Sequence, residues 1–290
     1  MNLILVALTM APAANPKAAD VRGAVAFLTT HQLPSGGFVT TLPGKGEAPV
    51  PSLRTTRTAV RAYRLLGADV PNPDRVAAFT LACHDAKTGG FADRPGAAPD
   101  PVATAVALMV LRELKRPEGD YLGPGLAFVG EKTAGFEQIR MAATGLEELG
   151  KTVPQQKKWA AEVEAGRNPD GSYGKGPGAA RATALNAVAL QRLGGRVDAA
   201  AVLKVLRAGL RAYGGFGGDA AGGSDLEACY RVVRLFDRLK AKPDRPADLD
   251  RFIASCKHKD GTYSTKSGDP PSLHATYHAA ELRHWLGGDK

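Results

Sequence analysis

A glycine followed by an aromatic residue recurs through the chain, and this repeat constrains the fold more than any other feature of the sequence. The aromatic residues of the motif are Phe38, Phe91, Phe136, Tyr173, Phe216 and Tyr263. Successive aromatic positions are 53, 45, 37, 43 and 47 residues apart. Recurrence at such intervals is typical of helical repeat arrays, in which each unit is one supersecondary structure packed on its neighbours.

The segments on either side of each turn have different hydrophobic patterns. Residues 21–28 and 249–256, which precede turns, show the 3.6-residue period of a helix with one face in water. Residues 102–111 and 182–190, which follow turns, are apolar nearly all round. We therefore expect them to be helices buried on both sides. Glycines that follow Leu66, Leu149 and Leu193 are expected to end such helices.

This alternation predicts six outer and six inner helices, which together form six hairpins. Six hairpins can curl and close on themselves, so that no terminal repeat needs a cap. The predicted fold is all-α, an α6/α6 toroid with inner and outer helix rings, formed by residues 17–290 as a single domain. Because every repeat runs from turn to loop to inner helix, residues at the starts of inner helices should converge on one rim.

Charge and cysteine content exclude few functions. The net charge of +9 favours anionic partners, but the Lys and Arg residues are scattered and no nucleic-acid-binding motif is present. Three cysteines do not make a disulfide framework. No apolar stretch is long enough to span a membrane.

The first residues leave the cellular location open. Residues 1–16 are expected to be either a signal peptide or a disordered N-terminus. An apolar run ends in Ala11-Pro12-Ala13, which looks like a cleavage site, but no Lys or Arg precedes the run. A cytoplasmic and an exported protein are equally compatible with this segment.

A carboxylate, a thiol and an imidazole stand at matching places in two successive repeats. Glu227 and Cys229 follow the turn at Phe216, and His274 follows the turn at Tyr263. Zinc accepts these three ligand types, and catalytic zinc sites use three protein ligands and one open position. The sequence therefore predicts a Zn²⁺ site of Glu227, Cys229 and His274 at the rim of the inner barrel.

Other interpretations of these residues remain open at the level of sequence. Ser224 and Glu227 have the spacing of a helix capping box, and Cys229 by itself would most often be a small buried residue. Asp225 lies one turn before Cys229 and is an alternative ligand. His278, one turn after His274, is a weaker alternative ligand.

Arginines on apolar inner helices are costly unless they are paired or face water. Arg140 and Arg181 either bind an anion in the cavity or pair with a carboxylate such as Glu137. Arg54, Arg57 and Arg61, on the first inner helix, either extend the positive lining or are solvated.

These motifs resemble the α/α toroid of the prenyltransferase and squalene-cyclase superfamily, from about Val21 to Gly288. Within it, the chain is most similar to the β-subunits of protein prenyltransferases. Their zinc ligands are an aspartate two residues before a Cys-Tyr pair and a histidine in the next repeat. The counterparts here are Glu227, Cys229 with Tyr230, and His274, with Glu in place of Asp.

The resemblance implies a zinc-dependent enzyme that transfers an isoprenoid group from a diphosphate to a cysteine thiol of a peptide or protein. It also implies that Arg140, Arg181 and Tyr230 hold the diphosphate, that no residue outside the zinc site is catalytic, and that a second subunit takes part. The family's cations before the zinc cysteine are missing from residues 219–225. The alternative is a non-catalytic toroid that keeps a zinc site and recognises a peptide or lipid.

Overall fold

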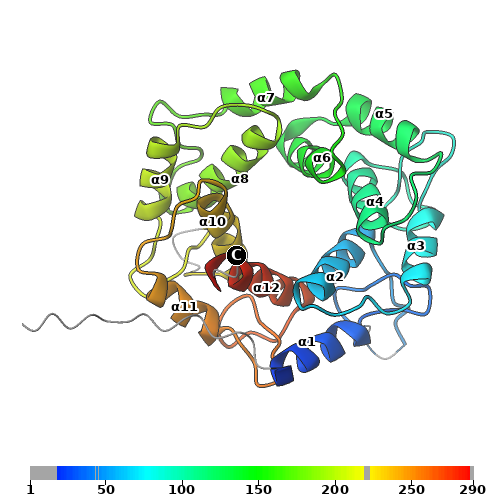
Figure 1. Cartoon of the computed structure of the whole chain (residues 1–290), viewed down its shortest axis with the longest axis horizontal. Helices are drawn as coiled ribbons and strands as arrows, with labels where there is room; N and C mark the ends of the chain where they lie inside the picture. Colours follow the sequence, from blue (N-terminus) through cyan, green and yellow to red (C-terminus); the bar gives the residue numbers. More distant parts are fainter. Residues whose placement is uncertain (1–17, 43, 45, 219–222, 288–290) are drawn as a thin grey trace, which may run out of the picture.

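Helices alternate between an outer and an inner ring (Figure 1). The structure, a computed structural model, describes residues 18–42, 44, 46–218 and 223–287, which form twelve α-helices. The outer helices are α1 (Ala18–Thr30), α3 (Pro73–Ala82), α5 (Leu122–Lys132), α7 (Gln156–Ala165), α9 (Ala199–Ala208) and α11 (Pro246–Ser255). The inner helices are α2 (Leu53–Leu65), α4 (Pro101–Glu113), α6 (Gly135–Leu149), α8 (Ala179–Arg192), α10 (Leu226–Arg238) and α12 (Leu273–Gly287). Each inner helix packs against the next, and α12 packs against α2, so the predicted toroid of six hairpins is confirmed.

The inner helix α4 illustrates why the ring forms. Its residues 103–111 are all buried. A helix that is apolar on every side must be covered on every side. In the ring, α4 lies between α2 and α6, and the outer helices α3 and α5 pack against it. The two-sided burial predicted for this segment is therefore confirmed.

Local signals set the ends of the inner helices. Side chains of Ser52, Asp100 and Asp225 cap α2, α4 and α10, each accepting a hydrogen bond from a backbone N–H three residues later. The glycines predicted to end helices all have positive φ angles: Gly67, Gly150 and Gly194.

Glycine turns pack against the start of the following outer helix. A Cβ atom on Gly214 would lie 2.3 Å from the carbonyl oxygen of Asp248 on α11, and one on Gly261 would lie 2.2 Å from that of Asp20 on α1. Both glycines also have positive φ angles, 93° and 84°. The contact of Gly261 with α1 joins the last repeat to the first and so closes the outer ring.

The prediction of a turn at Gly135 and Phe136, the third of the six motifs, is wrong. Gly135 and Phe136 belong to the first turn of α6, and only Thr133 and Ala134 separate this helix from α5. Gly135 has a positive φ of 72°, like the turn glycines, but the backbone enters the inner helix at once. The motif by itself therefore does not distinguish a long connection from a short one.

A threonine near the start of four inner helices holds the preceding turn, and we call this residue the anchor of its helix. The anchors Thr56, Thr104, Thr183 and Thr276 accept hydrogen bonds from the backbone N–H groups of Phe38, Phe91, Tyr173 and Tyr263 at 3.0, 2.8, 2.9 and 3.1 Å. The anchor side chain therefore points toward the turn. Residues one and five positions later share a different face of the helix.

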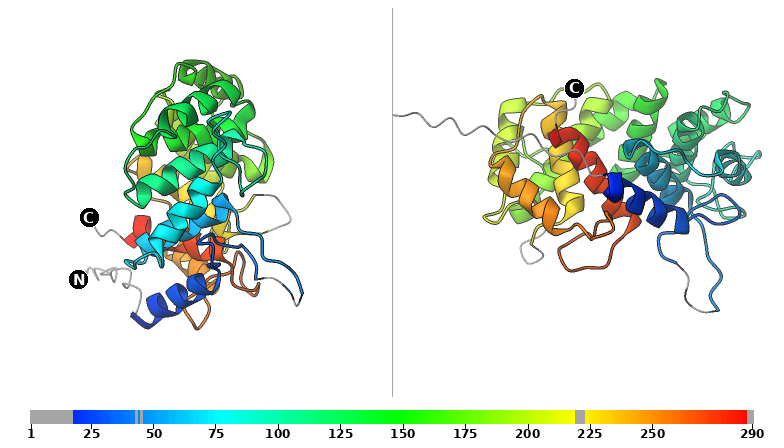
Figure 2. Two further views of the ribbon diagram at one scale, coloured as in Figure 1. Left: turned by 90° about the vertical axis from the view of Figure 1, so that its right-hand side faces the viewer. Right: turned by 60° about the horizontal axis from the view of Figure 1, so that its bottom comes forward.

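Connections that precede α2 and α12 extend beyond the helices on the same side of the ring (Figure 2). Both helices therefore begin on that side. In the part of the chain that the structure describes, no helix is both long and apolar enough to cross a membrane. The segment predicted to be a signal peptide or a disordered N-terminus lies outside the described residues.

Candidate functional site

The inner ring surrounds a cavity of about 660 Å³, to which all six inner helices contribute side chains. Four carboxylates line it: Glu137, Glu148, Asp237 and Glu281. Nine arginines line it: Arg54, Arg57, Arg61, Arg64, Arg140, Arg192, Arg231, Arg234 and Arg238. The cavity is therefore polar, and its arginines outnumber its carboxylates.

On one side of the cavity, charges are matched. We call Arg57 and Arg61 of α2, Glu148 of α6 and Glu281 of α12 the paired wall. Arg57 lies 2.6 Å from Glu148, and Arg61 lies 2.9 Å from Glu281 and 3.6 Å from Glu148. Burial acts to lower the pKa of Arg61, but Tyr277, Glu281 and Glu148 outweigh it and raise that pKa. Each of these charges therefore has an opposite charge beside it.

On the other side, arginines share carboxylates. We call Arg140 of α6, Arg192 of α8, and Arg231, Arg234 and Arg238 of α10 the cationic wall. Glu147 binds both Arg192 at 2.7 Å and Arg238 at 2.9 Å. Arg140 pairs with Glu137 at 2.7 Å, and Arg231 lies 3.3 Å from Glu227.

Arg234 differs from its neighbours because no carboxylate among the described residues pairs with it. The residue is 8% exposed, and its Nη1 donates to the Tyr230 hydroxyl at 3.3 Å. Its Nε and Nη2 atoms are buried without a hydrogen-bond partner in the described part of the chain. Burial, and the charges of Arg192 and Arg231, lower the pKa of Arg234 to about 10, although Tyr230 acts in the opposite direction. A buried guanidinium with unused donors is costly unless an anion or an ordered water molecule binds it.

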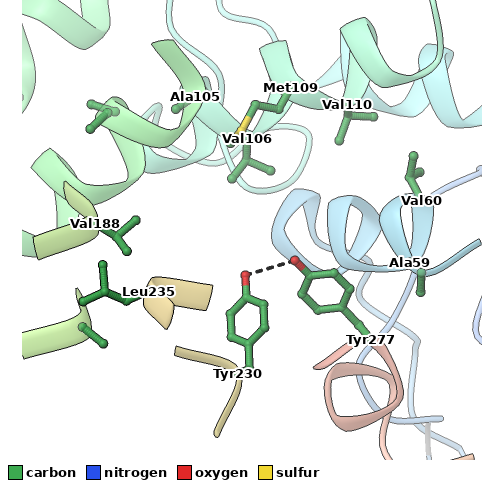
Figure 3. Packing of buried hydrophobic residues seen from close by; sticks show 14 of the residues in the cluster. Ala59, Val60, Ala105, Val106, Met109, Val110, Val188, Tyr230, Leu235 and Tyr277 are labelled. Atoms are coloured by element: carbon green, nitrogen blue, oxygen red, sulfur yellow. Dashed lines mark hydrogen bonds between the residues drawn. The ribbon is translucent and has the colours of Figure 1, made fainter. Parts of the chain in front are cut away.

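An aromatic cluster lies beside Arg234 and contacts it through Tyr230. The Tyr230 and Tyr277 hydroxyls lie 3.1 Å apart and point toward one another (Figure 3), and Tyr277 donates to Glu281 at 3.0 Å. The Tyr230 ring stacks on His278 and Trp285, with ring centroids 4.6 and 5.4 Å away. Guanidinium carbons of Arg231 and Arg234 lie 5.0 and 5.2 Å from the centroid of the Tyr230 ring.

The same surroundings change the acidity of Tyr230. Burial acts to raise the pKa of this phenol, but the charges of Arg234 and Arg231 outweigh it and lower the pKa to about 8. At neutral pH the hydroxyl is therefore protonated, and it titrates a little above neutrality.

Arg234 was missed by the sequence analysis, although its position follows from the anchor register. In α10 the anchor position is held by Cys229, whose sulfur accepts the backbone N–H of Phe216. Arg57, Tyr230 and Tyr277 come one residue after the anchor position of their helices, and all three line the cavity. Arg61, Arg234 and Glu281 come five residues after it, and they line the cavity as well. The spacing of four residues between a capping side chain and the anchor was the signal that could have located these residues.

The predicted zinc ligands are held by other interactions. Glu227 lies 2.9 Å from Arg181 and 3.3 Å from Arg231. Asp225 caps α10 by accepting from the backbone N–H of Ala228 at 2.7 Å, so the capping box predicted for Ser224 and Glu227 is wrong. Among the described residues, no group of three or more His, Cys, Asp or Glu side chains is placed to hold a metal ion.

Cys229 takes the place of a turn anchor. Its sulfur accepts a hydrogen bond from the backbone N–H of Phe216 at 3.2 Å, as the threonines do in four other repeats. The residue is fully buried, and burial raises the pKa of its thiol, so it stays protonated. Because Cys229 is bound to the turn, Glu227 is bound to two arginines, and no group of three such side chains meets among the described residues, the predicted set of Glu227, Cys229 and His274 does not fit zinc in this geometry.

The two histidines line the central cavity instead. Burial lowers the pKa of His274, and Glu227 acts in the opposite direction. His278 is stacked on Tyr230, and burial, together with Arg231, His274 and Arg234, lowers its pKa well below the ordinary value. Both imidazoles are therefore neutral at neutral pH.

Of the residues predicted to bind a diphosphate, Arg140 and Tyr230 line the cavity. Arg181 is bound to Glu227, and Arg140 is bound to Glu137, the carboxylate named as its alternative partner. Arg54 pairs with Asp100 at 3.2 Å, so it is not simply solvated. Arg234, which the sequence analysis did not name, lines the same cavity.

Comparison with known proteins supports the fold. A family model described as the prenyltransferase alpha-alpha toroid domain matches residues 59–128 and 136–282. The unmatched residues between these segments contain the connection that lacks a glycine turn. No curated protein matches the chain.

Several solved structures share this architecture at low sequence identity. A protein from Actinoplanes is 15% identical, with 93% of this chain and 99% of that chain covered and a TM-score of 0.61. The type II terpene cyclase MstE from Scytonema is 13% identical, with 92% and 96% covered and a TM-score of 0.60. A glycosidase in complex with glucose is 14% identical, with 92% and 96% covered and a TM-score of 0.62. At these identities the likeness concerns the fold alone.

Proposed function

Because the chain belongs to the prenyltransferase α/α toroid family, we propose that its central cavity binds the anionic headgroup of a diphosphate ester. The family membership suggests an isoprenoid diphosphate as the first ligand to test. The observation that supports the proposal is Arg234, a buried guanidinium that lines the cavity with two nitrogens lacking a hydrogen-bond partner among the described residues.

The surroundings of Arg234 favour a ligand with more than one negative charge. Burial and the charge of Arg231 lower the pKa of Arg140, so these guanidiniums repel one another across the cavity. A diphosphate offers several oxygen acceptors, and charge-assisted hydrogen bonds to arginine are among the stronger ones. Binding would supply the negative charge that the cationic wall lacks.

Transfer of an isoprenoid to a cysteine thiol, with zinc and a second subunit, remains a prediction from the family resemblance. Zinc would hold the acceptor thiol as the reactive thiolate. Since the predicted ligands do not fit a metal in this structure, we assign no step of a reaction to zinc. The measured zinc content of purified wild-type protein and of Cys229→Ala and His274→Ala tests the metal site, and full zinc in both variants would exclude it.

Calorimetric titration of the purified chain with farnesyl diphosphate and inorganic diphosphate tests the binding proposal. The variant Arg234→Gln should bind about 10- to 100-fold more weakly, since hydrogen bonds to charged groups contribute about 1.5–3 kcal/mol. The control is Arg251→Gln on α11, which removes the same charge from an arginine whose side chain is 74% exposed. It should change the affinity by no more than about twofold. Absence of binding to wild-type protein, or equal losses in both variants, would contradict the proposal.

A further inference from the structure

We propose that Glu113, the last residue of α4, is a proton-binding site whose protonation strengthens anion binding in the central cavity. This inference rests on the proposed function, because the anion is the ligand of that cavity. It goes further by assigning a second ligand, the proton, to a residue that is not part of the cavity lining.

The carboxyl group of Glu113 is buried without hydrogen bonds. Its side chain is 7% exposed, and neither oxygen has a hydrogen-bond partner in the described part of the chain. Its ion-pair partner is Arg64, whose Nη1 atom lies 3.5 Å away and whose side chain is 67% exposed. A partner so accessible to water compensates little for the desolvation of a carboxylate. Binding of a proton removes that cost.

The nearby arginines of the paired wall are engaged by other carboxylates. Arg57 lies 2.6 Å from Glu148, and Arg61 lies 2.9 Å from Glu281. Glu113 is therefore an additional carboxylate beside this wall. It also stands at the C-terminal end of α4, where the helix dipole disfavours a negative charge.

Charged groups on the helices packed against α4 act on Glu113 in both directions. Burial raises the pKa of Glu113, and Glu148 of α6 adds to this, although Arg61, Arg57 and Arg64 of α2 act in the opposite direction. The other two helices packed against α4 are α3 and α5, and their charged residues are all exposed: Asp74, Arg75, Glu131 and Lys132. The carboxyl group of Glu113 therefore keeps its proton to a higher pH in the folded protein than in the unfolded chain.

Protonation of Glu113 changes the charge beside the cavity. The three arginines of α2 that act on it all line the cavity. When Glu113 is ionised, their charges are balanced by three carboxylates: Glu113, Glu148 and Glu281. When Glu113 is protonated, one positive charge is left over, which favours a bound anion. By linkage, a bound anion in turn favours the protonated form of Glu113.

Urea denaturation of the unliganded protein tests the proton site by itself. The unfolded chain releases the Glu113 proton near the ordinary pKa of 4.5, whereas the folded protein releases it at higher pH. Because the folded protein binds more protons between these two values, its unfolding free energy falls as the pH rises through this interval and stays lower above it. Glu113→Gln keeps the shape and removes the ionisation. The urea midpoint of the wild type should therefore fall relative to that of Glu113→Gln between pH 4.5 and pH 7.

The matched control is Glu118→Gln, in the connection after α4, which removes a carboxyl group whose side chain is 60% exposed. Its urea midpoint should change with pH in parallel with that of the wild type. If the midpoints of Glu113→Gln and the wild type also change in parallel, the inference is overturned.

Calorimetric titration with inorganic diphosphate at pH 4.5 and pH 7, at constant salt, tests the coupling. At pH 7 the ionised Glu113 opposes the anion, so Glu113→Gln should bind about fivefold more tightly than the wild type, which corresponds to about 1 kcal/mol for a nearby unit charge. At pH 4.5 Glu113 is protonated, and the two proteins should bind nearly equally. The ratio of the two affinities cancels the ionisation of the ligand and of the cavity histidines, which occurs in both proteins.

The outcomes separate this inference from the function on which it rests. If diphosphate binds neither protein at either pH, the proposed function fails, and the inference fails with it. If it binds with the same affinity ratio at both pH values, the proposed function stands and only the inference fails. If Glu118→Gln changes the affinity as Glu113→Gln does, the effect belongs to the net charge of the protein, and the inference again fails. A ratio that rises from about one to about five only in Glu113→Gln supports both.

Discussion

Arg61 and Arg234 occupy the same register position on their helices, five residues after the anchor position, yet their surroundings are opposite. Arg61 on the paired wall lies close to Glu148 and Glu281. Arg234 on the cationic wall has no carboxylate partner among the described residues, and two of its nitrogens lack a hydrogen bond there, compared with one nitrogen of Arg61. The comparison shows that one residue type at one structural position can be paired with carboxylates in one repeat and lack such a partner, among the described residues, in another.

The difference has an energetic consequence. Removing one partner of a buried ion pair destabilises the protein, because the other charge is left buried and unpaired. A buried charge that has no partner already reduces the stability of the unliganded protein. The paired wall should therefore respond to charge removal as a structural element. The cationic wall should respond as a binding site that is maintained at some cost in stability.

Removal of the charge on the paired wall should have the largest effect. In Arg61→Met, Glu281, whose side chain is 4% exposed, loses its partner at 2.9 Å. We expect the free energy of unfolding to decrease by about 3–5 kcal/mol, measured by urea denaturation with helical circular dichroism. Arg251→Met, at an exposed ion pair, serves as the control and should cost less than about 1 kcal/mol. Equal costs at both sites would mean that the paired wall is not structural.

The same substitution on the cationic wall should increase the free energy of unfolding. Arg234→Met removes a desolvated guanidinium that burial and two nearby arginines disfavour. We expect the unliganded protein to gain about 1–2 kcal/mol of unfolding free energy, less than the loss in Arg61→Met because the bond to Tyr230 is also removed. The same denaturation experiment measures it. A loss as large as that in Arg61→Met would remove the distinction between the two walls.

Raising the pH should weaken anion binding by the cationic wall. The charges of Arg234 and Arg231 lower the pKa of Tyr230 to about 8 against the effect of burial, so the phenol is neutral below this pH and becomes a phenolate above it. The groups around it are Arg140, Arg231, Arg234, Tyr277, His278, Glu281 and Trp285. The phenolate would compete with the ligand for Arg234. Affinity should therefore fall about tenfold between pH 7 and pH 9, because a unit charge nearby contributes about 1 kcal/mol or more.

Tyr230→Phe provides the control for the pH effect, because it keeps the ring and removes the titrating hydroxyl. The ratio of wild-type to variant affinity cancels the ionisation of the ligand itself. A ratio that does not change with pH would show that Tyr230 does not titrate in this range.

The smallest predicted effect is that of Cys229→Thr, at the anchor position of α10. Cys229→Thr should leave the unfolding free energy nearly unchanged, because the hydroxyl can accept the N–H of Phe216 as in the other repeats. Cys229→Ala should cost about 1–3 kcal/mol, since a buried N–H then lacks its partner. Thermal unfolding of both variants checks this. A folded Cys229→Thr protein that has lost bound zinc would favour the ligand role instead.

Much of the fold could be predicted because its signals are local. The glycine turns need positive φ and a close backbone approach, and the inner helices need apolar residues on every side, so both are visible as residue types. Where the connection is short, as before Gly135, the same motif appears inside a helix and the prediction is wrong. Of the residues that the resemblance implies for diphosphate binding, Arg140 and Tyr230 line the cavity, and their binding role stays a prediction.

The predicted zinc site shows the limit of this reasoning. Residue types and spacing placed Glu227, Cys229 and His274 on successive inner helices, but one residue of rotation along a helix changes its direction by about 100°. Cys229 occupies the anchor position of α10, so its sulfur points toward the backbone N–H of Phe216. The sequence analysis did not recognise this anchor position.

The sequence by itself determined the architecture: twelve alternating helices, a closed ring, and several arginines on its apolar inner helices. Only the tertiary structure decided which of these arginines are neutralised. Charge pairing depends on side chains that meet across the ring, such as Arg61 with Glu281, which are 220 residues apart in the chain. No local pattern records such a contact, because it exists only after the last repeat has closed on the first.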